Sequence, residues 1–359
     1  TQASGELATG SQQATFDAMN LFMKTLLDPF VAGRTGQGPT QGATGYVEEG
    51  GADAYAAATR RATAHDAYAM FTKATPANFD QRWSVWAAGF GGTQTTDGNA
   101  AVGSNQASSR IFGTAVGADT LLTPRTLAGF AIAGGGTNFS VANLGGGRSD
   151  LFQAGAYLRH NVGPAYLAAA LAYGWQDVTT DRMVTAAGLD RLRAEFQANA
   201  FSGRAEGGYR FAMGWAGITP YAAGQFTSFD LPAYAEQVLA GSGAFALSYA
   251  AKTVTDARSE LGFRTDKSIA LPDGVMTLRS RFAWAHDFNP DRSIAATFQA
   301  LPGASFVVNG AAQARDSALT TAALEMRWLN GWSAAVSFEG EFSNVTASYA
   351  GKGLVHYAW

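Results

Sequence analysis

The feature that most constrains this chain is an alternation of apolar and polar residues, which recurs from residue 82 to the C-terminus. Successive side chains of an extended strand point to opposite faces, so alternation separates the two kinds of residue. In "WSAAVSFEGEF" (332–342) the large apolar residues share one face, while Glu339 and Glu341 lie on the other. The same split recurs in "MTLRSRFAWAHDF", "DARSELGFR", "ALEMRW" and "SGRAEGGYRF". These segments are predicted strands with one apolar and one charged face.

Residues 82–359 divide into twelve such strands. Their expected ranges are 82–92, 107–121, 125–137, 149–160, 164–177, 195–212, 215–229, 254–267, 275–288, 315–329, 332–343 and 347–359. Short turns such as "LTP", "NVG" and "MG" alternate with long loops, among them 138–148 and 178–194. Only the last connection, around "NVT", is short where a long one is due.

Composition helps to decide where the apolar faces go. Charged residues make up only 15% of the chain, whereas roughly a quarter is usual for a soluble protein. No run of about eighteen apolar residues is present, which excludes a helical membrane span. A single strand of this kind could belong to a soluble sandwich with its polar face in water. An even number of strands, about ten to fifteen residues long, with short turns at one end and longer loops at the other, instead predicts a transmembrane β-barrel.

The fold class expected is therefore all-β membrane: a 12-stranded antiparallel transmembrane β-barrel, with an N-terminal α-helical segment plugging the lumen. Residues 1–81 form the segment before the barrel, with predicted helices at about 11–29 and 52–74. Twelve tilted strands leave a channel of roughly 10 to 14 Å, which one thin helix fills. The Ala-rich helix 52–74, or both helices, is expected in the pore, with Arg60 and Arg61 facing lumen acids.

The charged faces of the strands are expected to line the lumen as ion pairs that satisfy buried charge. The predicted lumen-lining residues are Arg204, Glu206, Arg210, Arg258, Glu260, Arg264, Arg279, Arg281, Glu325, Arg327, Glu339 and Glu341. Glu339 and Glu341 could also form a catalytic pair, which leaves an outer-membrane hydrolase as a minor alternative. No cofactor or metal site is predicted, because the chain has no cysteine and its histidines lack ligand spacing. The net charge of −3 gives no sign of nucleic-acid binding.

The whole chain resembles the C-terminal translocator domain of type V secretion autotransporters of Gram-negative bacteria. The segments that carry the resemblance are "TFDAMNLFMKTLLDPFVAGR", "GYVEEGGADAYAAATRRA", "RWSVWAAGFGG", "LPGASFVVNGAAQARDSA", "WSAAVSFEGEFS" and the terminal "GLVHYAW". The resemblance implies a barrel in the outer membrane that anchors and exports an N-terminal passenger, which is absent from these residues. A porin-like diffusion channel remains the main alternative.

The same resemblance implies an assembly signal in the last strand, carried by Tyr357 and Trp359. Lys352 also matches this signal, whereas Leu354 stands where the family has glycine. The expected partners are outer-membrane lipid, the chain's own passenger, the barrel assembly machinery and periplasmic chaperones, with the barrel itself a monomer. The chain has no Asn-Asn dipeptide, so the self-cleavage of some family members is not expected. Because the first residue is Thr1, we expect a fragment of a longer, processed precursor.

Overall fold

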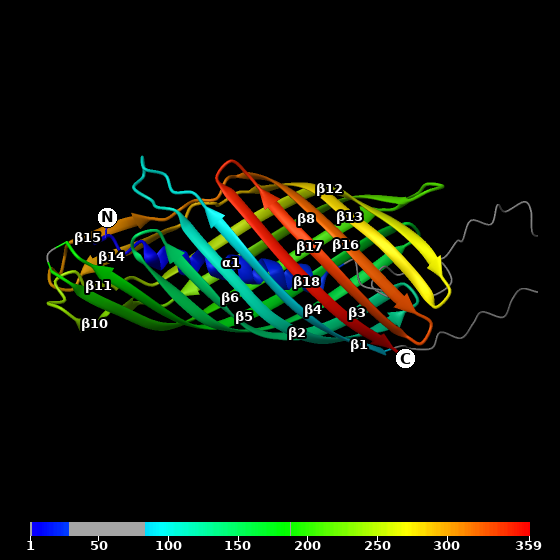
Figure 1. The fold of residues 1–359 in the computed structure, drawn as a ribbon, viewed down its shortest axis with the longest axis horizontal. Helices are drawn as coiled ribbons and strands as arrows, with labels where there is room; N and C mark the ends of the chain where they lie inside the picture. The colour runs from blue at the N-terminus through cyan, green and yellow to red at the C-terminus, as the bar shows by residue number, and fades with distance from the viewer. Residues whose placement is uncertain (1, 29–82, 187) are drawn as a thin grey trace, which may run out of the picture.

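A computed structural model describes residues 2–28, 83–186 and 188–359. Its main body is a tilted barrel of long strands around one helix (Figure 1). The barrel strands are β1 (Trp83–Thr96), β2 (Ala107–Thr123), β3 (Thr126–Val141), β4 (Gly145–Val162), β5 (Ala165–Val184), β6 (Asp190–Tyr209), β8 (Gly217–Leu231), β12 (Lys252–Leu271), β13 (Gly274–Asp287), β16 (Asp316–Trp328), β17 (Trp332–Phe342) and β18 (Thr346–Ala358). They confirm the predicted strands, with ends that differ most at β5 and β6.

The barrel is closed by pairing its first strand with its last. β1 and β18 run antiparallel from the Ser84–Ala358 pair to the Thr96–Thr346 pair, and β6 pairs directly with β8. Closure leaves no edge strand in the ring of described strands, so each strand pairs with a neighbour on both sides over most of its length. Within the described residues the ring has twelve strands, as the alternation predicts.

The apolar faces of the strands point outward and the polar faces point into the lumen. On β17, Val336 and Phe338 are exposed on the outer surface, while Ser333 and Glu341 are buried. Aromatic rings collect where the chain ends: Trp332 packs on Tyr357 at 4.9 Å between ring centroids, and Tyr357 packs on Trp359 at 5.8 Å. Such rings prefer the membrane–water interface.

The connections at the two ends of the barrel differ less than the sequence predicts. Segments 97–106, 232–251 and 288–315 are long, but the predicted long loops 138–148 and 178–194 are wrong. There, β3 to β6 continue as two tall hairpins: a short turn at 142–144 joins β3 to β4, and β5 extends to Val184 before β6 begins at Asp190. The alternation of burial persists in these extensions, but the outward residues become polar, as in the exposed pair of Arg193 and Asp181 at 2.8 Å. A strand that leaves the bilayer no longer needs an apolar face. The apolar–polar alternation, which predicts the strand, therefore ends before the strand itself does.

A second, four-stranded sheet lies outside the barrel, at the end where the N-terminus is found (Figure 1). It is built from the two longest loops, as β9 (Tyr234–Ala235), β11 (Leu247–Tyr249), β14 (Ser293–Phe298) and β15 (Ser305–Asn309). Two short strands, β7 (Phe211–Ala212) and β10 (Gln237–Ala240), extend the barrel sheet at its ends.

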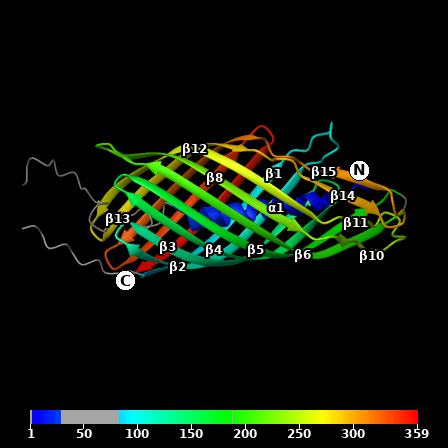
Figure 2. The ribbon, with the colours of Figure 1, turned by 180° about the vertical axis from the view of Figure 1, so that it is seen from behind.

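The helix α1 (Leu7–Leu26) lies inside the lumen, as both views show (Figures 1 and 2). The predicted range was 11–29, so the helix begins four residues earlier than predicted and also ends three residues earlier than predicted. The second predicted helix, 52–74 with Arg60 and Arg61, and the boundary between 81 and 82 lie outside the described residues. Among the described residues, no helix is long and apolar enough to span a bilayer.

Candidate functional site

The filled lumen is the candidate functional site, and one side of α1 packs tightly against the barrel wall. Met19, Phe22 and Leu26 are almost fully buried there. They lie against glycines: a Cβ added at Gly155 would be 2.6 Å from the Leu26 side chain, and one at Gly174 would be 2.7 Å from the Met19 sulfur. The absence of side chains at these wall positions therefore lets the helix approach the strands closely.

Four of the predicted lumen residues form one buried ion network on the side of the lumen where β8 lies between β6 and β12. Arg264 on β12 makes two 2.7 Å hydrogen bonds to the carboxylate of Glu206 on β6. Arg204 on β6 donates at 2.9 and 2.8 Å to Glu260 on β12 and at 3.1 Å to Glu206. The hydroxyl of Tyr166 adds a 2.8 Å bond to Glu206. Bidentate pairs of this kind fix geometry strongly, so the network ties two strands together beside the end of α1.

The remaining predicted acids on β16 and β17 also lie beside arginines. Arg281 contacts Glu339 at 3.2 Å, Arg258 contacts Glu341 at 2.5 Å, and Arg279 contacts Glu325 at 2.5 Å. Since Glu339 and Glu341 are both held in ion pairs, their geometry favours a structural role over a catalytic one. In the described part of the chain, no group of three or more histidine, cysteine or acidic residues could hold a metal ion.

Two predicted lumen residues lie away from this network. Arg210 follows the last residue of β6, is about one third exposed, and contacts Asp266 at 2.7 Å. Arg327 is half-buried, one residue before the end of β16. Both positions keep the alternating phase of their strands, but the strands reach the short-turn end of the barrel there. Phase alone does not tell how far along the barrel a residue lies.

Charged residues of α1 itself were missed as lumen charges. Lys24 contacts Glu339 at 3.0 Å, and Asp28, just beyond α1, contacts Lys352 of β18. Both residues lie in the amphipathic segment that predicted the first helix. The sequence signal was therefore present, but it could not show which helix enters the barrel.

The N-terminal end of α1 is held by a collar, which we define as Asn105, Arg182, Glu236 and Tyr249. Arg182 and Glu236 form a fully buried bidentate pair at 2.9 and 2.5 Å, and Arg182 also donates to the carbonyl oxygen of Gln2 at 2.9 Å. The backbone N–H of Asn105 donates to the Glu6 carboxylate at 2.6 Å, and its side-chain amide does so at 2.5 Å. Burial raises the pKa of Glu6, and the bonds from Asn105 oppose that rise.

The collar gives a first prediction. Glu236→Ala leaves the Arg182 guanidinium buried without its carboxylate, which costs about 3 to 5 kcal/mol for a pair of this kind. We expect faster amide hydrogen exchange in residues 2–12 and unchanged exchange in β16 to β18. Glu236→Gln keeps a hydrogen-bond acceptor, so its exchange rate in residues 2–12 should lie between the rates of the wild type and Glu236→Ala. Equal exchange in the wild type and Glu236→Ala would show that the collar does not hold the helix end.

Known proteins resemble this chain in sequence and in structure. The family model described as the autotransporter beta-domain matches residues 85–339. The structure is similar to the translocator domain of the autotransporter NalP from Neisseria meningitidis, with 17% identity, a TM-score of 0.60, and coverage of 85% of this chain and 97% of that one. It is also similar to the beta domain of the Bordetella autotransporter Brka, with 17% identity, a TM-score of 0.59, and coverage of 77% and 99%. No curated protein sequence matches the chain.

Proposed function

This chain belongs to the family of autotransporter beta-domains, and from that membership we propose how its filled barrel serves a passenger protein. The domain is an anchor and translocator in the outer membrane of a Gram-negative bacterium. The family implies a passenger attached to it. We propose that this passenger precedes residue 1 and is exported to the cell surface.

The observation that carries this proposal is the position of α1. Its N-terminal end lies beside the four-stranded sheet of β9, β11, β14 and β15, at the end of the barrel opposite the C-terminus (Figure 1). A passenger joined to Gln2 through the collar would therefore emerge on the outer side, while α1 stays in the lumen as its tether. A diffusion channel would instead need the space that α1 occupies.

The further partners that we propose are those expected for a protein of this family. The barrel assembly machinery would bind the aromatic C-terminal strand, and periplasmic chaperones would hold the strands before they pair. We propose a monomer with no nucleic-acid partner, and we propose that the domain is not an enzyme. Support for the last point comes from Glu339 and Glu341, whose charges are matched by Lys24, Arg281 and Arg258.

Surface display tests the proposed function. A reporter domain fused before residue 1 should become accessible to protease added to intact cells when the chain carries a secretion signal. The matched control joins the same reporter after Trp359, where it should remain in the periplasm. A reporter that stays protected in both fusions would exclude export by this domain.

The C-terminal residue gives a second prediction. The backbone N–H of Trp359 donates to the carbonyl oxygen of Trp83 at 3.2 Å, so its loss removes one bond at the closing seam. Deleting Trp359 should cost roughly 1 kcal/mol in the refolded barrel, as for a typical hydrogen bond. Insertion in cells should fall much more, because the proposed assembly signal is lost. Membrane fractionation measures insertion, urea unfolding of the refolded protein measures stability, and a proportionate loss in both would contradict a signalling role.

A further inference from the structure

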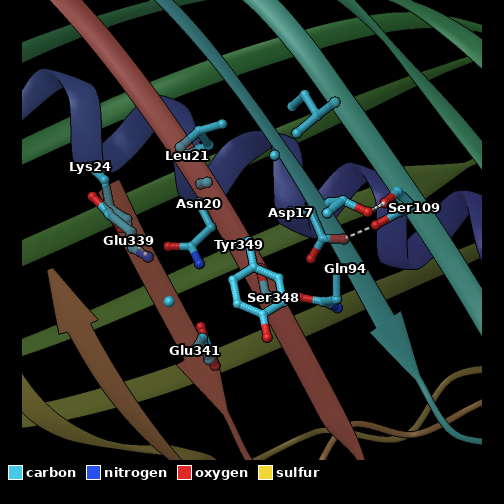
Figure 3. A pocket seen from close by; sticks show the side chains of 15 residues that line it. Asp17, Asn20, Leu21, Lys24, Gln94, Ser109, Glu339, Glu341, Ser348 and Tyr349 are labelled. Carbon is cyan, nitrogen blue, oxygen red and sulfur yellow. Dashed lines mark hydrogen bonds and ion pairs between the residues drawn. The ribbon is translucent and has the colours of Figure 1, made fainter. Parts of the chain in front are cut away.

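Along one side of α1, four cavities in the described part of the lumen follow one another between the helix and the wall. Their volumes are about 10, 30, 50 and 20 Å³, from the N-terminal end of the helix to its C-terminal end. Consecutive cavities share lining residues: Gln13 joins the first two, Asp17 the next two, and Lys24 the last two. The 50 Å³ cavity lies between α1 and strands β1, β17 and β18 (Figure 3).

The helix residues along these cavities form what we call the polar stripe: Gly10, Gln13, Asp17, Asn20 and Lys24. They recur at three- and four-residue steps, so they share one face of the helix. The tightly packed Met19, Phe22 and Leu26 lie on other faces. The helix therefore has a close-packed apolar side and a loosely packed polar side.

Unpaired polar atoms point to water on the loosely packed side. The side-chain oxygens of Gln13 and Asn20 and the amide nitrogen of Gln94 on β1 are buried without a partner in the described residues. Gln94 is only 6% exposed, and it lines three of the four cavities. Buried polar groups in folded proteins are almost always hydrogen-bonded. A cavity needs roughly 10 to 15 Å³ to hold a water molecule, so the cavities of about 20, 30 and 50 Å³ each have room for one.

Most charged groups beside the polar stripe lie in ion pairs. Lys24 and Arg281 contact Glu339, Arg258 contacts Glu341, and Arg292 contacts Asp256, which also borders the cavities. Asp17 is different, since its partners are the hydroxyl of Ser109 at 2.5 Å and the amide of Gln13 at 2.8 Å. Its carboxylate thus has no ion pair among the described residues, and the polar residues Asn20 and Ser348 line the same cavity.

We propose that the polar stripe and the strands facing it form a hydrated site for small monovalent cations, centred on Asp17. Carboxylate, amide and hydroxyl oxygens replace the hydration shell of such ions, as oxygen ligands do in selectivity filters. The uncompensated carboxylate favours a cation over an anion, and the small volumes exclude larger solutes. This property is independent of passenger export.

Silver ion tests the site, because it is a small monovalent cation that binds thiols, and the chain has no cysteine of its own. Asn20→Cys places a thiol on the polar stripe, and the matched control Met19→Cys places one on the neighbouring close-packed position. Both folded barrels are exposed to silver nitrate, then denatured, and free thiols are labelled with a maleimide. We expect Asn20→Cys to be protected at least about tenfold faster, because a packed thiol must wait for local opening.

A second comparison tests the charge. Adding Asp17→Asn to Asn20→Cys should slow protection several-fold, since the attraction for the cation is lost. Equal rates for Asn20→Cys and Met19→Cys would overturn the hydrated site, and equal rates with and without Asp17→Asn would overturn its cation preference. Heat-modifiable gel mobility identifies folded variants, and Gln13→Cys replaces Asn20→Cys if that variant does not fold. Surface display of a reporter by the same variants separates this result from the test of export.

Discussion

Deleting residues 1–28 should raise the single-channel conductance of the barrel on the order of tenfold. The reason is geometric: an α-helix with its side chains is ~10 to 12 Å wide, whereas the cavities beside it are about one water molecule wide. Conductance of a short pore grows with its open cross-section, so removing α1 exchanges a water-sized gap for a helix-sized one. Planar-bilayer recording of the full chain and the deletion variant in the same salt measures the difference.

The matched control keeps α1 but weakens its ties to the wall. Lys24→Ala with Asp28→Ala removes the contacts to Glu339 and Lys352, while Met19, Phe22 and Leu26 remain packed on the strands. We expect this double variant to stay in the low-conductance state with brief openings. If the deletion variant also stays in the low-conductance state, α1 is not what closes the lumen. If the double variant conducts like the deletion variant, the charged contacts keep α1 in the lumen, and the packing of its apolar side does not.

Glu206→Ala should produce a large loss of stability. Its carboxylate is buried at 4% exposure and accepts bonds from Arg264, Arg204 and Tyr166. Arg204 keeps Glu260 as a partner, but Arg264 keeps no carboxylate within the described residues. Removing one partner of a buried pair costs about 3 to 5 kcal/mol, because the other charge remains desolvated. Equilibrium urea unfolding of the barrel in lipid vesicles, followed by tryptophan fluorescence, measures the loss.

Two controls separate burial from charge. Asp181→Ala breaks an arginine–carboxylate pair of similar length on the exposed part of β5, and should cost less than about 1 kcal/mol. Glu206→Leu with Arg264→Met removes both charges, and should restore most of the stability that Glu206→Ala loses. If Glu206→Ala and Asp181→Ala cost the same, the network contributes no more than a surface pair. The lumen around Glu206 would then be as wet as the protein surface.

The wall of the barrel could be predicted from sequence because lipid imposes a period of two. Val336 and Phe338 face outward and Glu341 faces inward for the same reason, and the phase persists along each strand. The ends of β5 and β6 were missed because outward residues such as Asp181 and Arg193 stand above the bilayer. Lipid no longer selects apolar side chains there, so the apolar pattern in the sequence stops before the strand ends.

The partners inside the lumen could not be predicted in the same way. Alternation places Glu206 and Arg264 on inward faces, but only the registers of β6 and β12 against the intervening β8 bring the two side chains to the same height in the lumen. The collar is further from prediction still, since Arg182 and Glu236 come from a strand extension and a long loop. Their contact depends on the position of the N-terminal end of α1, which cannot be predicted from either segment alone.

The pairing of β1 with β18 also sets an order of events during biogenesis. At the closing seam Ser84 pairs with Ala358, so the ring cannot close until β18 has been synthesised. Contacts between such distant residues carry a high loop-closure entropy and form slowly. Until then β1 keeps an open edge in the periplasm or at the membrane. The time spent in that open state, rather than the stability of the finished barrel, is the interval in which aggregation and proteolysis compete with assembly.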